Sequence, residues 1–188
     1  MNKHYLLTLT LLSMLLCITS ISQAKDPIRT IEGIVINVSD GDSIQVKDNL
    51  GTKVKVRLYG IDAPEAENTS RKTRKVTKPG QFYGEEARIA LGKKLYDKKV
   101  KLDVMDIDKY RRLVSIVYLD GKNINQEMVA EGCAWAYRKY LDKALASDFI
   151  QLEEQAKAKR LGLWQYDKPE PPWEFRKRIK KSMRDQVW

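Results

Sequence analysis

Between Ile28 and Leu58, apolar and polar residues alternate with the period of two that is typical of half-buried β-strands. Two turns, at residues 39–42 and 48–51, divide this segment into three parts. We therefore expect a meander of three antiparallel strands. The first strand, residues 30–38, is almost wholly apolar in its middle, as expected for a strand that is covered on both faces or curled into a barrel.

Charged residues are concentrated at the ends of these strands. The turn after the first strand and the end of the third supply four carboxylates and one guanidinium: Asp40, Asp42, Arg57, Asp62 and Glu65. If the strands pair, these groups meet at one sheet edge, where carboxylates suit a hard cation, a Glu can act as a general base and an Arg can bind phosphate. The alternative is two surface turns whose charges are solvated, because Asp-Gly is common in hairpin turns.

The N-terminal segment, residues 1–24, has the pattern of a secretory signal peptide. It contains a Lys, a Leu-rich apolar run and a Ser-Gln-Ala sequence that ends at Ala24. We predict cleavage after Ala24, a secreted or periplasmic protein, and no stable membrane insertion once the signal is removed. A single membrane anchor is the competing interpretation.

Removal of residues 1–24 would leave no histidine and one cysteine, Cys133. Without an imidazole, His-dependent nucleases, His-ligated metalloproteases and Ser-His-Asp hydrolases are excluded. A lone cysteine cannot close an internal disulfide. Acid–base chemistry must therefore use a carboxylate, Lys, Tyr, Arg or metal-bound water.

The formal net charge of +10 indicates an anionic polymer or surface as the partner. Part of this charge lies in residues 67–80, which we expect to be a mobile basic loop. Such a loop can contact a phosphate backbone beside Asp62 and Glu65, or it can be an ordinary solvated loop.

The remaining pattern alternates between strands and helices. We expect an amphipathic helix at residues 84–95, preceded by the packing residues Phe82 and Tyr83, and strands at 100–104 and 113–119. Further along, we expect an Asn-capped helix at 125–131, a strand at 133–137, and a helix capped by Ser147 that runs to Arg160.

The turn at residues 106–112 carries a second group of charged and aromatic residues. Arg112 begins a strand and has Lys109 and Tyr110 beside it. Together with Arg57 it provides two guanidiniums from two strands, which can stabilise the negative charge that grows on a phosphorus under attack.

Five short motifs occur in the order seen in the staphylococcal nuclease (thermonuclease) family, which the chain therefore resembles. They lie at residues 40–43, 57–65, 83–87, 108–112 and 154–164. The resemblance implies a mainly β, α+β fold: a five-stranded OB-type barrel with about three packed helices. It also implies a calcium-dependent nuclease that hydrolyses phosphodiester bonds of DNA and RNA and leaves 3′-phosphate ends. We expect low base specificity and a monomer.

The resemblance also assigns roles by position. Calcium ligands would be Asp42, Asp62 and the backbone carbonyl of Ala63. Catalytic residues would be Arg57, Glu65 and Arg112, with Glu65 activating the attacking water. Substrate-binding residues would be Lys109, Tyr110 and Tyr137.

One position departs from the family pattern, which usually has Gly where this chain has Arg111. Gly there would permit an unusual backbone angle or a close approach of substrate. Either Arg111 or Arg112 could then be the second phosphate-binding arginine, and the spacing from Asp108 and Tyr110 favours Arg112.

We divide the chain into a signal peptide (1–24), a catalytic domain (25–166) and a Pro-rich linker with a basic tail (167–188). The tail is either a basic helix that adds affinity for an anionic partner or a solvated extension. The alternative to a nuclease is a non-catalytic OB-fold module that binds nucleic acid.

Overall fold

The computed structural model describes residues 25–70 and 72–185. Its strands are β1 (Arg29–Asp40), β2 (Ser43–Asp48), β3 (Lys53–Leu58), β4 (Ile61–Asp62), β5 (Asn68–Thr69), β6 (Val76–Lys78), β7 (Lys99–Ile107), β8 (Leu113–Leu119), β9 (Lys122–Asn123) and β10 (Trp135–Ala136). Its helices are α2 (Gly84–Leu95), α3 (Ile124–Ala130), α4 (Lys143–Ala158), the 3₁₀ turn η1 (Gly162–Gln165) and α5 (Pro172–Asp185). The predicted signal peptide lies outside the described residues.

Five strands form a closed barrel in the order β3-β2-β1-β7-β8. Neighbours are antiparallel, and a parallel pairing between β3 and β8 closes the barrel. The three-strand meander is β1, β2 and β3, as the alternation predicted. The OB-type, mainly β α+β fold is therefore confirmed, with four α-helices in the described residues where about three were expected.

The barrel is filled by the apolar face of each strand and is covered by helices. Inward-facing side chains such as Val46, Val56 and Leu102 are almost completely buried. Helix α2 adds Leu91 and Leu95 to the same core. Its predicted bounds match the structure because its apolar residues recur at helical spacing and acidic and basic residues flank its ends.

Three predictions of element boundaries need correction. Helix α4 begins at Lys143, because the Asp142 side chain accepts a hydrogen bond from the backbone N–H of Ala144, and Ser147 lies inside the helix. Helix α3 begins at Ile124 and is capped by Asn123. The expected strand at 133–137 is only the two residues of β10, which pair with β4.

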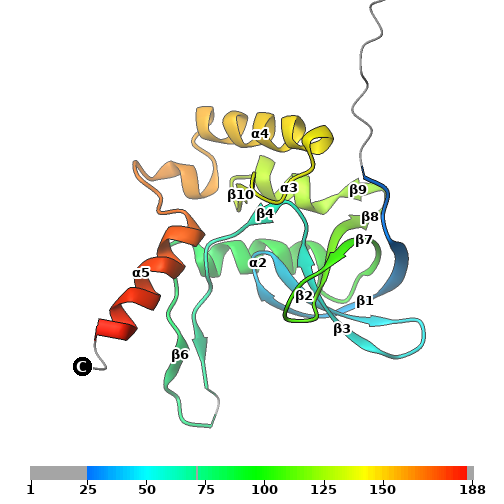
Figure 1. The fold of residues 1–188 in the computed structure, drawn as a ribbon, viewed down its shortest axis with the longest axis horizontal. Helices are drawn as coiled ribbons and strands as arrows, with labels where there is room; N and C mark the ends of the chain where they lie inside the picture. The colour runs from blue at the N-terminus through cyan, green and yellow to red at the C-terminus, as the bar shows by residue number, and fades with distance from the viewer. Residues whose placement is uncertain (1–24, 71, 186–188) are drawn as a thin grey trace, which may run out of the picture.

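Residues 67–80 also differ from the predicted irregular loop. They contain β5 and β6, which pair as a short antiparallel hairpin. This hairpin projects from the barrel on the same side as α5 (Figure 1).

Phe82, expected to be a packing residue, is 59% exposed and lies against the Tyr166 ring, whereas Tyr83 packs against the core.

Within the part of the chain that the structure describes, no helix is long and apolar enough to cross a membrane.

Candidate active site

Asp42 lies in the tight turn between β1 and β2, and its side chain is directed into the protein. It is 2% exposed, and one carboxylate oxygen accepts a hydrogen bond from the backbone N–H of Ala63 at 2.8 Å. The other oxygen accepts from the Ser43 hydroxyl and forms an ion pair with Arg57. Burial raises the pKa of Asp42, but Arg57 and the hydrogen bonds outweigh it and lower the pKa below its ordinary value. Asp42 is therefore a buried anion.

Asp62 is brought to the same place by a different pairing. Strand β4 pairs with β10 so that Asp62 is opposite Trp135, and the carboxylate is fully buried. Arg57 donates to its Oδ1 at 2.7 Å. One guanidinium thus joins Asp42 and Asp62, as strand pairing predicted. Burial is the main reason that the pKa of Asp62 is raised, although the neighbouring guanidiniums oppose the shift.

Glu65 and Asp40 share a cation from the β5–β6 hairpin. The Lys78 ammonium forms ion pairs with both carboxylates. Asp40 Oδ1 also accepts a hydrogen bond from the backbone N–H of Ala66 at 2.9 Å. Burial, together with the Asp42 carboxylate, raises the pKa of Asp40 to about 6, while Lys78 opposes the shift. The hairpin therefore contributes one of its basic residues to the site itself.

Besides Lys78, the structure adds a second basic residue that the sequence did not single out. Arg176, on α5, donates to Asp62 Oδ2 at 2.6 Å and to Asp62 Oδ1 at 3.1 Å. The same guanidinium donates to Glu65 Oε1 at 2.6 Å. In the sequence, Arg176 is one of several basic residues in the predicted tail, and no motif distinguishes it from the others.

Arg112 lies directly before β8, at the end of that strand which pairs with β3. In this parallel pairing, Arg57 is opposite Val114, two residues after Arg112. Here Arg112 Nε donates to Asp108 Oδ2 at 2.7 Å, which holds the side chain beside the β7–β8 turn.

Arg111 has the unusual backbone angle that the family's Gly suggested. Its φ is 62°, in the left-handed region, and its exposed side chain leaves the turn. Its backbone N–H donates to the Asp108 carbonyl at 2.8 Å. The position is thus a turn position, and Arg112 lies between it and Leu113, the first residue of β8.

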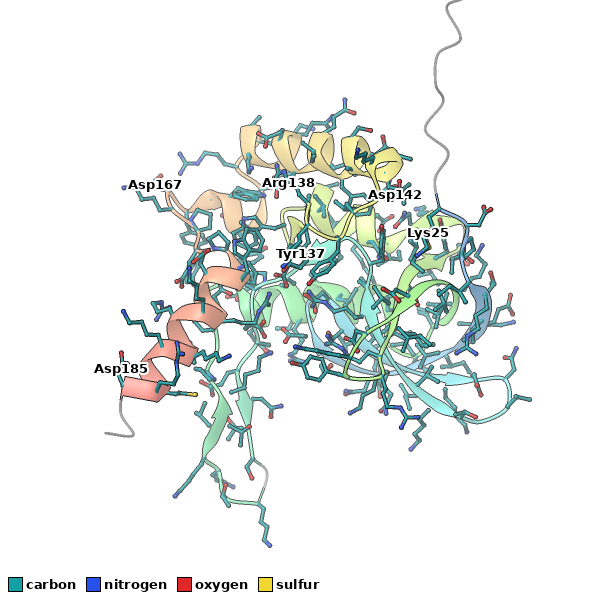
Figure 2. All side chains as sticks on the ribbon, in the orientation of Figure 1. Lys25, Tyr137, Arg138, Asp142, Asp167 and Asp185 are labelled. Atoms are coloured by element: carbon teal, nitrogen blue, oxygen red, sulfur yellow. The ribbon has the colours of Figure 1, made fainter. Side chains whose placement is uncertain are left out.

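The predicted substrate-binding residues fall into two groups. Lys109 and Tyr110 are exposed on the β7–β8 turn, where the Tyr110 ring is 5.6 Å from the Arg112 guanidinium carbon. Tyr137 follows β10, and its backbone N–H donates to the Gly60 carbonyl, two residues before Asp62. Burial and then the Asp62 carboxylate raise the pKa of Tyr137. Figure 2 shows Tyr137 between α5 and the barrel strands.

The donor set at this site fits a calcium ion in its chemistry. Asp42 and Asp62 offer hard anionic oxygens that are buried and share one guanidinium, and Ala63 is adjacent to Asp62. Their oxygens are directed to arginines and backbone N–H groups, and among the described residues no three His, Cys, Asp or Glu side chains are grouped as a metal site. Backbone carbonyls and water would have to complete the coordination.

The sequence is also similar to those of known nucleases. Residues 55–166 match the family model "Staphylococcal nuclease homologue". An "Uncharacterized endonuclease" of Haemophilus influenzae is 33% identical over 182 residues, which cover 97% of this chain and 90% of that protein. A "Micrococcal nuclease" of Shigella flexneri is 34% identical over 159 residues, 80% of this chain and 83% of that protein. A staphylococcal-like nuclease of Arabidopsis thaliana is 36% identical over 135 residues, 72% of this chain and 37% of that protein.

Proposed function

Because this chain belongs to the staphylococcal nuclease family, we propose that it is a calcium-dependent nuclease that hydrolyses phosphodiester bonds of DNA and RNA. The observation that carries the proposal is the bridge of Arg57 between the buried carboxylates of Asp42 and Asp62, with Glu65 in the same network. Buried charged groups of this kind cost folding free energy and are concentrated at functional sites.

Each residue has a definite role in this proposal. Asp42, Asp62 and the Ala63 carbonyl would hold calcium, which supplies a Lewis acid beside the phosphoryl oxygens when it is bound. The Glu65 carboxylate accepts the proton of the attacking water. The guanidiniums of Arg57 and Arg112 stabilise the charge that develops on the phosphoryl oxygens.

The substrate would lie along the face that carries Tyr137, Lys109 and Tyr110. Aromatic rings stack on any base and basic side chains bind any phosphate, so we propose low base specificity for DNA and RNA. A cleavage map of a mixed-sequence strand tests this, and strong preference for one short sequence would contradict it.

We also propose that the products end in a 3′-phosphate. A polymerase is then expected not to extend them, and treatment with a phosphatase is expected to restore extension.

The main experiment measures cleavage of single-stranded DNA by residues 25–188, with calcium or with excess chelator. A double variant, Arg57→Ala with Glu65→Ala, removes the bridging guanidinium and the proposed base. The matched control is Arg88→Ala with Glu85→Ala, an exposed ion pair on α2 with the same change in charge. We expect calcium-dependent cleavage by the wild type and the control, and none by the site variant.

The alternative function is a non-catalytic OB-fold module that binds nucleic acid, with which the net charge of +10 is equally consistent. The same experiment separates the two. Binding of DNA without cleavage, equal in the wild type and the Arg57 and Glu65 variant, would support the binding module and overturn the nuclease.

We also propose that the protein is secreted or periplasmic and monomeric. The signal-like sequence of residues 1–24 supports export. N-terminal sequencing of the protein recovered from producing cells is expected to begin at Lys25, and its mass in solution is expected to be that of one chain.

A further inference from the structure

Helix α5 follows a Pro-rich linker and is attached to the barrel by its first turn. Only Pro172 and Phe175 are buried among its residues, whereas the part from Lys180 to Asp185 is exposed. Figure 2 shows Asp185 at the end of the helix that lies furthest from the barrel. The helix is strongly basic, with six Lys or Arg residues and two acidic residues among its fourteen. The contacts of the first turn therefore decide where α5 sits.

One of these contacts occupies the carboxylates of the candidate active site. Arg176 donates to both oxygens of Asp62 and to one oxygen of Glu65, at distances between 2.6 and 3.1 Å. Arg57 also donates a hydrogen bond to Asp62 Oδ1. Two guanidiniums thus occupy Asp62, and paired charge-assisted hydrogen bonds of this kind are the strong ones.

A second contact covers the neighbouring aromatic residue. The Trp173 ring lies parallel to the Tyr137 ring, with centroids 5.5 Å apart and an interplanar angle of 11°. Trp173 also makes an edge contact with Trp135, which is opposite Asp62 in the β4–β10 pair. The first turn of α5 therefore covers an aromatic face and a pair of carboxylates that are adjacent on the barrel.

The helix nevertheless leaves space beside it. A groove of about 590 Å³ runs between α5 and the end of β6, with Lys78 and Pro79 on one wall and Phe175, Ile179 and Met183 on the other. Glu65 lies at this groove. The Arg176 side chain is 41% exposed, whereas the Asp62 and Glu65 side chains that it pairs with are 0% and 10% exposed. Arg176 thus lies at the boundary between solvent and the buried carboxylates.

We propose that α5 is a self-inhibitory cap, in which Arg176 competes with a divalent cation for Asp62 and also holds Glu65, the proposed base. A cation bound at Asp62 needs the oxygens that Arg176 holds, and it would be repelled by the guanidinium at that distance. Loading of the site therefore requires Arg176 to leave, which frees the first turn of α5. This inference rests on the proposed function, because it assumes that Asp62 binds calcium.

The first test measures the calcium dissociation constant by isothermal titration calorimetry for the wild type, Arg176→Ala and Arg178→Ala. Arg178 is the matched control: it lies two residues further along α5, forms an ion pair with Glu170, and its loss changes the charge equally. If Arg176 occupies the site about nine-tenths of the time, its removal tightens calcium binding about tenfold. We expect that change for Arg176→Ala and less than a twofold change for Arg178→Ala.

A second measurement follows the helix directly. Trypsin cleaves after Lys and Arg, and α5 carries six such residues. Calcium is expected to accelerate tryptic cleavage within α5 of the wild type, and Arg176→Ala is expected to be cleaved quickly with or without calcium. An unchanged cleavage rate of α5 in the wild type at saturating calcium would overturn the cap.

The outcomes separate this inference from the proposed function. Wild-type protein that binds calcium and cleaves DNA, together with an Arg176→Ala variant that binds calcium no more tightly, overturns the cap and leaves the nuclease intact. An Arg176→Ala variant with unchanged calcium affinity and lost cleavage at saturating calcium overturns it as well, and assigns Arg176 to the substrate. Failure of every variant to bind calcium overturns both proposals.

Discussion

Replacement of Arg111 by Gly is expected to stabilise the protein and to preserve cleavage. Arg111 has a φ of 62°, which costs a residue with a side chain about 1–2 kcal/mol. Gly removes that strain, but its greater backbone freedom in the unfolded chain lowers the free energy of unfolding by about 0.5–1 kcal/mol. The net expectation is an increase of about 0.5–1 kcal/mol in the free energy of unfolding. Arg111→Ala keeps the strained angle and removes only an exposed side chain, so its stability should change by less than about 0.5 kcal/mol.

Urea unfolding followed by tryptophan fluorescence measures these differences, provided that the slope with denaturant is the same in each variant. A Gly variant that is less stable than the Ala variant would refute the strain argument.

The same proteins, together with Arg112→Ala, test which of the two arginines binds phosphate. We expect cleavage to survive Arg111→Gly and Arg111→Ala and to fall by about 10²–10³ in Arg112→Ala. Loss of activity in Arg111→Ala with activity retained in Arg112→Ala would show that the two arginines were assigned in the wrong order.

Three further predictions test the fold around the site. Asn125→Ala removes a fully buried amide that bonds one backbone N–H and two backbone carbonyls, so we expect a loss of about 3 kcal/mol in urea unfolding. Gly84→Ala would place a Cβ against the carbonyl of Glu65, and cleavage should fall, whereas Gly92→Ala, with open space around it on the same helix, should leave cleavage unchanged. Burial raises the pKa of Cys133 to about 11, so its thiol is protonated at pH 8, and mass spectrometry should find it unmodified by iodoacetamide until urea is added.

The barrel could be predicted because its strands carry their pattern locally. The alternation between Ile28 and Leu58 predicts the meander without knowledge of any distant contact. The starts of α3 and α4 were harder, because Asn123, Asp142 and Ser147 are all good N-cap residues. Which of these residues caps each helix depends on the direction in which the chain enters the helix. Tertiary packing sets that direction.

Burial of particular polar residues could not be read from the pattern either. Asn125 was expected at the start of an Asn-capped helix, but its buried side chain bonds the backbone N–H of Val117 in β8 and the Tyr59 carbonyl. The same holds for Glu153, a fully buried residue of α4 that accepts a hydrogen bond from the backbone N–H of Ala136. Both residues satisfy backbone groups outside their own helix, so the signal for them lies in the fold and not in the pattern of the helix.

The candidate site shows the same division between local and distant information. Its four carboxylates, Asp40, Asp42, Asp62 and Glu65, lie within two short turns, so their convergence could be predicted from strand pairing. Buried carboxylates must be neutralised by partners, and this requirement could be predicted with them. The identity of those partners could not, because Lys78 comes from a hairpin that was expected to be a loop, and Arg176 comes from a helix beyond the family match, which ends at residue 166. A metal ion and a basic side chain satisfy the same requirement, and only the tertiary structure shows that Arg176 occupies Asp62 and Glu65.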